Sequence, residues 1–197
     1  MRIAGLVVLA GLIAAAWLLR PALPGADTGA GREKPPGIYP AGSRIEDRSA
    51  IGGFGPCDNF PKSLDGRDWG AAGAVSLVAF PDEPLAYFQH AGLALRVVNR
   101  TGEAVPCAAI DSCLRLVCEA RTAGGKWRAI EGEPESMCGN SFHRVFLGPG
   151  EYWEFPARRY DGPVPVKLRY RLDPGGGLPP IYSNEFDGRV TLAQLVN

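Results

Sequence analysis

Short hydrophobic segments separated by turn residues recur from about residue 74 to the end of the chain. The clearest is 166–172, VKLRYRL, where apolar and cationic residues alternate. Because successive side chains on a strand face opposite sides, this pattern predicts a strand that buries Leu168 and exposes Arg169. The other predicted strands are 75–80, 93–99, 114–120, 126–131, 142–147, 151–155, 181–186 and 189–195. No amphipathic helix is predicted after residue 20, so the pattern favours an all-β sandwich of about seven to nine antiparallel strands.

The part of the chain before residue 74 has a different texture. An unbroken apolar run from Ile3 to Leu19 lies between Arg2 and Arg20, and predicts a hydrophobic helix. Its length suits either a cleaved signal peptide or an uncleaved membrane anchor over 1–20, and both imply export. Residues 21–43 are rich in Pro, Gly and Ala and predict a flexible linker. Residues 44–73 predict an irregular segment, which leaves 74–197 as the sandwich domain.

The segment LGPGEYWEF (147–155) precedes the charged alternating strand and a final strand. In this order the C-terminal half resembles immunoglobulin-like or fibronectin-III-like sandwiches of exported proteins. The resemblance covers about 74–190 and implies a fold class, which hosts many unrelated functions. Cys118 and Cys138 flank Trp127 but lie closer together than in immunoglobulin domains.

All five cysteines follow the hydrophobic run, and none forms a C-x-x-C pair. An exported chain is expected to use them in disulfides rather than in a zinc or redox motif. We expect a Cys118–Cys138 bridge. The alternative is a small Cys107–Cys113 clip with the remaining cysteines paired elsewhere.

Composition excludes some classes of function. Lys and Arg total 21 and Asp and Glu total 21, so the chain lacks the basic excess of a nucleic-acid binder. No cofactor motif is present, and two histidines are too few for a convincing metal site. Arg158 and Arg159 precede the basic stripe on 166–172. This stripe would suit either an anionic partner or a solvated strand face.

Two groups of residues are candidates for a functional site. Ser141 and His143 are the nearest approach to a catalytic pair, but no G-x-S-x-G motif surrounds the serine. Tyr152, Trp153 and Trp127 could form an aromatic surface for sugars, as in carbohydrate-binding modules.

The sequence therefore predicts an extracytoplasmic domain, secreted, periplasmic or anchored to the membrane by its N-terminus. We expect no catalytic activity and a role in binding a protein partner or in envelope assembly. The alternatives are a carbohydrate-binding module that takes a glycan and, more weakly, a hydrolytic enzyme.

Overall fold

The computed structural model describes residues 35–50 and 57–196, all within one compact unit. The predicted helix over 1–20, with its role as signal peptide or anchor, lies outside the described residues. Within them, no helix is long and apolar enough to cross a membrane. The elements are β1 (Lys62–Ser63), β2 (Val75–Pro84), β3 (Gly92–Asn99), β4 (Val105–Ile110), β5 (Cys113–Leu114), β6 (Leu116–Arg121), β7 (Trp127–Ala129), η1 (Gly139–Ser141), β8 (Phe142–Leu147), β9 (Glu151–Arg158), β10 (Val164–Leu172), β11 (Ile181–Tyr182), β12 (Phe186–Val190) and α1 (Leu192–Val196).

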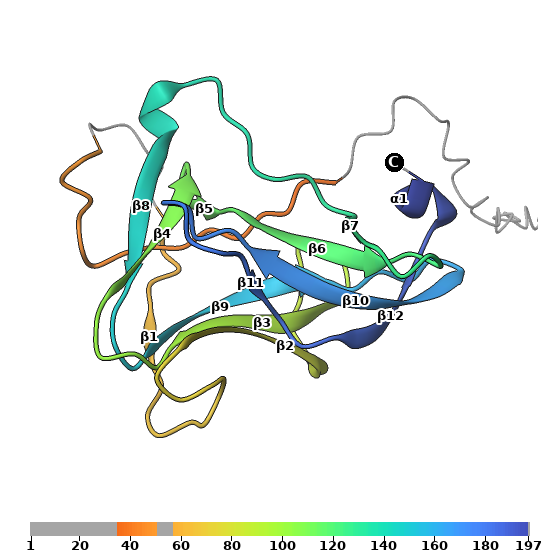
Figure 1. Ribbon diagram of the computed structural model, residues 1–197, viewed down its shortest axis with the longest axis horizontal. Helices are drawn as coiled ribbons and strands as arrows, with labels where there is room; N and C mark the ends of the chain where they lie inside the picture. The colour runs from red at the N-terminus through yellow and green to blue at the C-terminus, as the bar shows by residue number, and fades with distance from the viewer. Residues whose placement is uncertain (1–34, 51–56, 197) are drawn as a thin grey trace, which may run out of the picture. The chain divides into compact units, whose positions relative to one another are not determined.

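These strands form antiparallel sheets, which makes the domain all-β and compatible with a sandwich. One sheet has the order β1-β9-β3-β2, and the other has the order β11-β10-β6-β7 with β12 also paired to β10. Figure 1 shows the two sheets as two layers, with a small third sheet, β5-β4-β8, at one end. The predicted fold class is confirmed at this level.

Alternating residues build the core between the layers. On β10, Leu168, Tyr170 and Leu172 are buried, as the sequence pattern predicts. The facing sheet contributes Trp153 and Phe155 from β9, both fully buried. Burial of large apolar side chains on both inner faces is the main force that holds the layers together.

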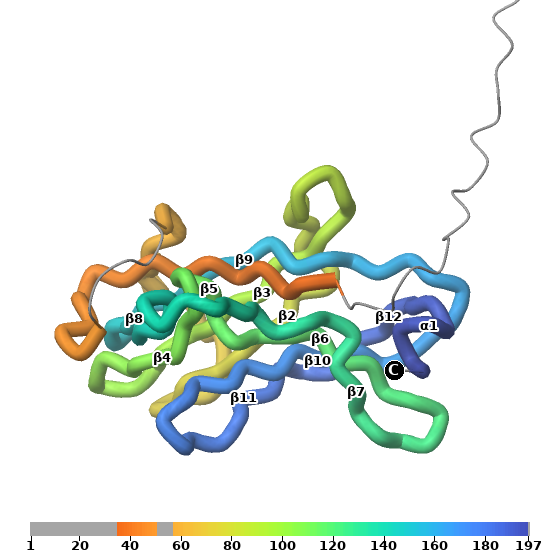
Figure 2. The backbone as a smooth tube through the Cα atoms, turned by 90° about the horizontal axis from the view of Figure 1, so that it is seen from above, coloured from red at the N-terminus to blue at the C-terminus, as the bar shows by residue number. Residues whose placement is uncertain are grey.

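Residues 35–43 belong to the folded domain, which corrects the predicted linker over 21–43. Tyr39 and Ala41 are fully buried in the core. The carbonyl of Tyr39 accepts from the Leu114 amide at 3.0 Å, and the Ala41 amide donates to the Ser112 carbonyl at 2.8 Å. Figure 2 shows this segment in orange, beside β5 and β9. Its Pro and Gly content conceals a two-residue alternation, in which Tyr39 and Ala41 share one face.

A buried carboxylate ties this segment to the core. Glu131 Oε2 accepts from the Tyr39 hydroxyl at 2.9 Å and from the Cys118 amide at 2.8 Å, while Oε1 accepts from the Tyr160 hydroxyl at 2.7 Å. Burial raises the pKa of Glu131 above its ordinary value, although these donors act in the opposite direction. The donors satisfy a group that would otherwise be costly to bury.

The structure differs from the predicted strands at β4 and at the C-terminal end. Strand β4 was not predicted, because VPCAAI has no apolar–polar alternation and contains Pro106. The predicted strands 181–186 and 189–195 become β11, β12 and the short helix α1. Helix α1 begins where the Gln194 side chain accepts from the Thr191 amide at 2.8 Å, as in a helix N-terminal cap.

Side chains satisfy the outward backbone groups of two edge strands. On β2, the Asn184 amide binds both the N–H and the C=O of Ala79, at 2.9 and 3.0 Å. On β8, the Arg144 amide donates to Asp47 at 2.9 Å and the Phe146 amide donates to Ser43 at 3.0 Å. These contacts occupy positions that a neighbouring strand would otherwise fill.

Candidate functional site

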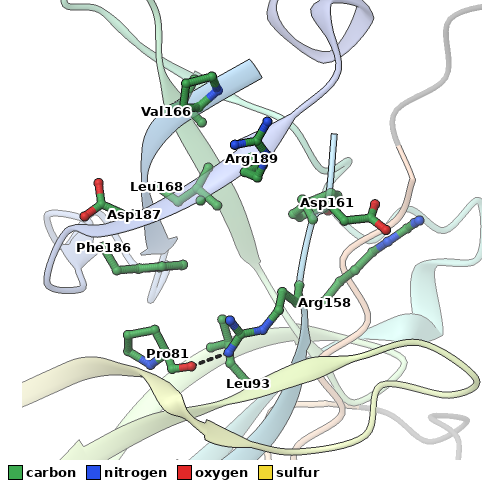
Figure 3. Close-up of a pocket in the computed structure, with 13 residues that line it drawn as sticks. Pro81, Leu93, Arg158, Asp161, Val166, Leu168, Phe186, Asp187 and Arg189 are labelled. Atoms are coloured by element: carbon green, nitrogen blue, oxygen red, sulfur yellow. Dashed lines mark hydrogen bonds between the residues drawn. The ribbon is translucent and has the colours of Figure 1, made fainter. Parts of the chain in front are cut away.

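A pocket of about 500 Å³ opens between the two sheets where β9, β10 and β12 approach one another (Figure 3). Its floor is apolar and its rim is charged. It is lined by Pro81, Leu93, Arg158, Arg159, Tyr160, Asp161, Pro165, Val166, Leu168, Phe186, Asp187, Gly188 and Arg189.

The floor comes from inward-facing strand residues. Leu93 on β3 and Leu168 on β10 are each 2% exposed, and Phe186 on β12 lies opposite Leu168 in the strand register. Gly188 leaves room for the Leu168 side chain, because a Cβ at position 188 would lie 2.2 Å from Leu168 Cδ1 and would force that side chain to shift. The antiparallel pairing of β12 with β10 places Gly188 and Phe186 beside Leu168.

Three arginines stand at the rim. Arg159 donates to the Pro81 carbonyl. Arg189 donates to the carbonyls of Gly162 and Pro163 at 3.0 and 2.8 Å. The Arg158 guanidinium lies 5.3 Å from the centre of the Tyr160 ring. These contacts orient the guanidinium groups without neutralising them.

The rim has a surplus of positive charge. Among the described residues, none of these three arginines forms an ion pair, in contrast to arginines on the sheet faces such as Arg96 and Arg169. Asp187 is already paired with Lys167 at 2.8 Å, which leaves Asp161 as the other acidic residue of the lining. A ligand that carries an anionic group would therefore be favoured.

The titratable side chains of the lining are those of the three arginines, Tyr160, Asp161 and Asp187. The lining includes no Ser, Cys or His that could serve as a nucleophile or general base. In the part of the chain that the structure describes, no cluster of three or more His, Cys, Asp or Glu could hold a metal ion. The arrangement can take an apolar group into its floor and an anion at its rim.

The aromatic candidates do not form a common surface. Trp153 is fully buried in the core, and its indole N–H donates to the Gly42 carbonyl at 2.8 Å. Tyr152, on the opposite face of β9, is 6% exposed and packs edge-on against Trp69. Trp127 lies on the other sheet, where the Arg169 guanidinium stacks on its ring at 4.2 Å. A sugar platform made of these three rings is therefore not present.

The predicted disulfides are also absent, because all five cysteines are free thiols. Cys118 is fully buried on β6, whereas Cys138 is exposed before β8, so the expected Cys118–Cys138 bridge does not form. Cys107 points into the core from β4, where burial raises its pKa to about 12, while Cys113 is half-buried. The alternative Cys107–Cys113 clip is likewise absent.

Ser141 and His143 do not form a catalytic pair through their side chains. His143 Nδ1 lies 3.0 Å from the main-chain oxygen of Ser141, and its Nε2 lies 3.4 Å from the hydroxyl of Ser112. The Ser141 hydroxyl instead accepts from Ser136 at 2.7 Å.

Arg158 and Arg159 stand out in the sequence as basic residues, but the sequence pattern does not place them at a pocket. The signal available was the pair of adjacent arginines before Tyr160, at the end of a predicted strand. Arg189 comes from a distant part of the chain, so its position required the strand pairing. Searches of protein-family models and of curated proteins found no match to this chain.

Proposed function

We propose that this chain is an exported or membrane-anchored, non-catalytic binding domain of the cell envelope. It uses an immunoglobulin-like sandwich as scaffold and holds a segment of a partner protein in the pocket between the sheets. The hydrophobic N-terminus supports export. What supports the binding role is the apolar pocket with three arginines that form no ion pair with a described carboxylate.

The pocket chemistry defines the segment it would take. A volume of about 500 Å³ falls within the range of small-ligand sites and has room for one or two large side chains. We expect an aliphatic or aromatic side chain of the partner to pack against Leu93, Leu168 and Phe186. A neighbouring carboxylate, from Asp, Glu or a chain terminus, would meet the guanidinium groups.

The two alternatives have less support. A carbohydrate-binding module would need exposed rings, and Tyr152 and Trp153 are buried. A hydrolase would need a nucleophile within reach of its base, and Ser141 presents its carbonyl rather than its hydroxyl to His143.

The test is selection of random displayed peptides on the immobilised full-length protein. The affinity of an enriched peptide is then measured by fluorescence anisotropy. We expect enriched peptides to combine a large apolar residue with a carboxylate. Arg158→Gln and Arg159→Gln should each weaken binding by roughly fivefold to tenfold, as expected for loss of a partly exposed charge contact.

Arg48→Gln is the matched control, because Arg48 is exposed and outside the pocket. It should leave the affinity unchanged. Raised ionic strength should weaken binding to the unaltered protein more than to the Arg158 variant. Enrichment of peptides without carboxylates, or equal affinities for all three variants, would contradict the proposal.

A further inference from the structure

Cys113 faces the outer side of the extended segment 39–42. Tyr39 and Ala41 point into the core, so the alternation turns Pro40 and Gly42 outward. Cys113 lies opposite Pro40 in an antiparallel bridge. Because directly opposed residues in such a pair project to the same side, the Cys113 thiol lies on the outward side.

Cys57 reaches the same side from the next part of the chain. The Gly42 amide donates to the Asn59 carbonyl at 2.9 Å, and the Asn59 side chain donates to the Pro40 carbonyl at 2.9 Å. A Cβ at position 42 would lie 2.9 Å from the Cys57 carbonyl oxygen. Glycine at this position therefore lets the backbone of Cys57 lie directly on the outer face.

The two cysteines thus share the outer side of segment 39–42, Cys113 opposite Pro40 and Cys57 against Gly42. Burial raises the pKa of Cys113, and negative charge on Cys57 raises it further, ahead of the contribution of Asp111. Both residues are half-buried, so a reagent can reach them, whereas Cys107 and Cys118 are closed in the core.

We propose that Cys57 and Cys113 form a disulfide. This bond would lie over the outer side of segment 39–42 and hold the segment in place. The oxidant is a small disulfide such as oxidised glutathione. The thiolate of one cysteine attacks a glutathione sulfur, forms a mixed disulfide and releases one glutathione thiolate. The thiolate of the other cysteine then attacks the protein sulfur, forms the intramolecular bond and releases the second glutathione. The two protein thiols lose two electrons and two protons, and the glutathione disulfide gains the electrons.

The experiment is exchange of the folded full-length chain with oxidised glutathione, followed by non-reducing peptide mapping. Trypsin alone leaves Cys107 and Cys113 in one peptide, so cleavage before aspartate is added to separate them. We expect peptide 49–57 linked to peptide 111–115. The reaction should accelerate as pH rises, because the attacking species is the thiolate and the Cys57 and Cys113 pKa values are both raised, Cys57 mainly by burial.

Matched variants separate this pair from chance oxidation. Cys57→Ser and Cys113→Ser should each abolish the linked peptide, whereas Cys138→Ser, which removes an exposed thiol, should retain it. Oxidation should raise the Tm of the unaltered chain by roughly 5–10 °C, because the bond closes a long loop in the unfolded state. A linked peptide that contains another cysteine, or only singly glutathionylated chains, would overturn the proposal.

Discussion

The outer faces of the two sheets carry the same arrangement of residues in different surroundings. On the β2–β3–β9 sheet, the Arg96 guanidinium lies 4.0 Å from the Trp69 ring centre and 4.2 Å from that of Phe80. On the β6–β10 sheet, Arg169 lies 4.2 Å from Trp127 and 4.0 Å from Tyr182. Arg96 also pairs with Glu83 and Glu154, and Arg169 pairs with Glu119.

The difference lies in what covers each arginine. Trp69 packs edge-on against Tyr152 and joins a second hydrophobic cluster with Leu64 and Val98, so the first face is closed. The Arg96 side chain is 8% exposed and pairs with Glu83 and Glu154 at 2.6 and 2.7 Å.

The second face remains open to solvent. The Arg169 side chain is 19% exposed, and Tyr182 above it is 45% exposed. Glu119 accepts from Arg169 and Arg171 at 2.8 and 3.0 Å, Glu133 also accepts from Arg171, and Asp187 pairs with Lys167. Each cation of the basic stripe noted in the sequence therefore has an acidic partner. The arginine between two rings is therefore nearly closed off from solvent on one face and more exposed on the other.

Removal of the arginine should give the largest difference in stability between the two faces. Arg96→Ala should lower the free energy of unfolding by about 3 kcal/mol, because it removes a buried guanidinium that lies between two rings and binds both Glu83 and Glu154. Arg169→Ala should cost about 1 kcal/mol, because the Arg169 side chain is more exposed than that of Arg96 and Glu119 keeps its bond to Arg171. Urea unfolding of both variants measures the two values. Equal losses would show that burial does not distinguish the faces.

Removal of the tryptophan that covers each arginine should give a smaller difference in stability between the two faces. Trp69→Ala should cost about 2 kcal/mol, because it removes the contacts with Phe80 and Tyr152 as well as the cover of Arg96. Trp127→Ala, the matched change on the open face, should cost less than about 1 kcal/mol. Thermal unfolding of the two variants side by side tests this order, and a greater loss for Trp127→Ala would reverse the assignment of the closed face.

The smallest expected effect is acid sensitivity, and it is shared by both faces. Burial raises the pKa of Glu154, but hydrogen bonds from Lys62 and Arg96 outweigh it and leave the pKa below its ordinary value of 4.5. Arg171 and Arg115 similarly leave the pKa of Glu133 lowered on the open face, against the opposing effect of burial.

A carboxyl group with a lowered pKa in the folded state stabilises the protein above about pH 4.5, and this contribution is lost as pH falls through the folded value. Glu154→Gln and Glu133→Gln should therefore each make stability less dependent on pH below about 4.5, by no more than about 1 kcal/mol. Urea unfolding between pH 3 and 6 gives the slopes. Unchanged slopes in both variants would refute the ion-pair explanation of acid sensitivity.

The sequence pattern was sufficient where one face of a strand is buried and the other is polar. The alternation on 166–172 correctly predicted that Leu168 is buried and Arg169 lies outside. It was insufficient for β3, where residues on both faces are buried, because a segment centred on Trp69 covers the outer face. The pocket was not predictable in this way, because Arg158 and Arg189 meet there through the pairing and packing of distant strands.

The side-chain contacts on β2 and β8 also bear on how the protein behaves at high concentration. Asn184 occupies the outward hydrogen-bonding groups of Ala79, and Asp47 and Ser43 occupy amides of β8. A strand edge with free backbone groups can recruit the same edge of another molecule and start a growing polymer. A few short polar side chains thus occupy positions at which another molecule would pair with β2 or β8, and we expect a substitution at one of them to favour aggregation while leaving the core intact.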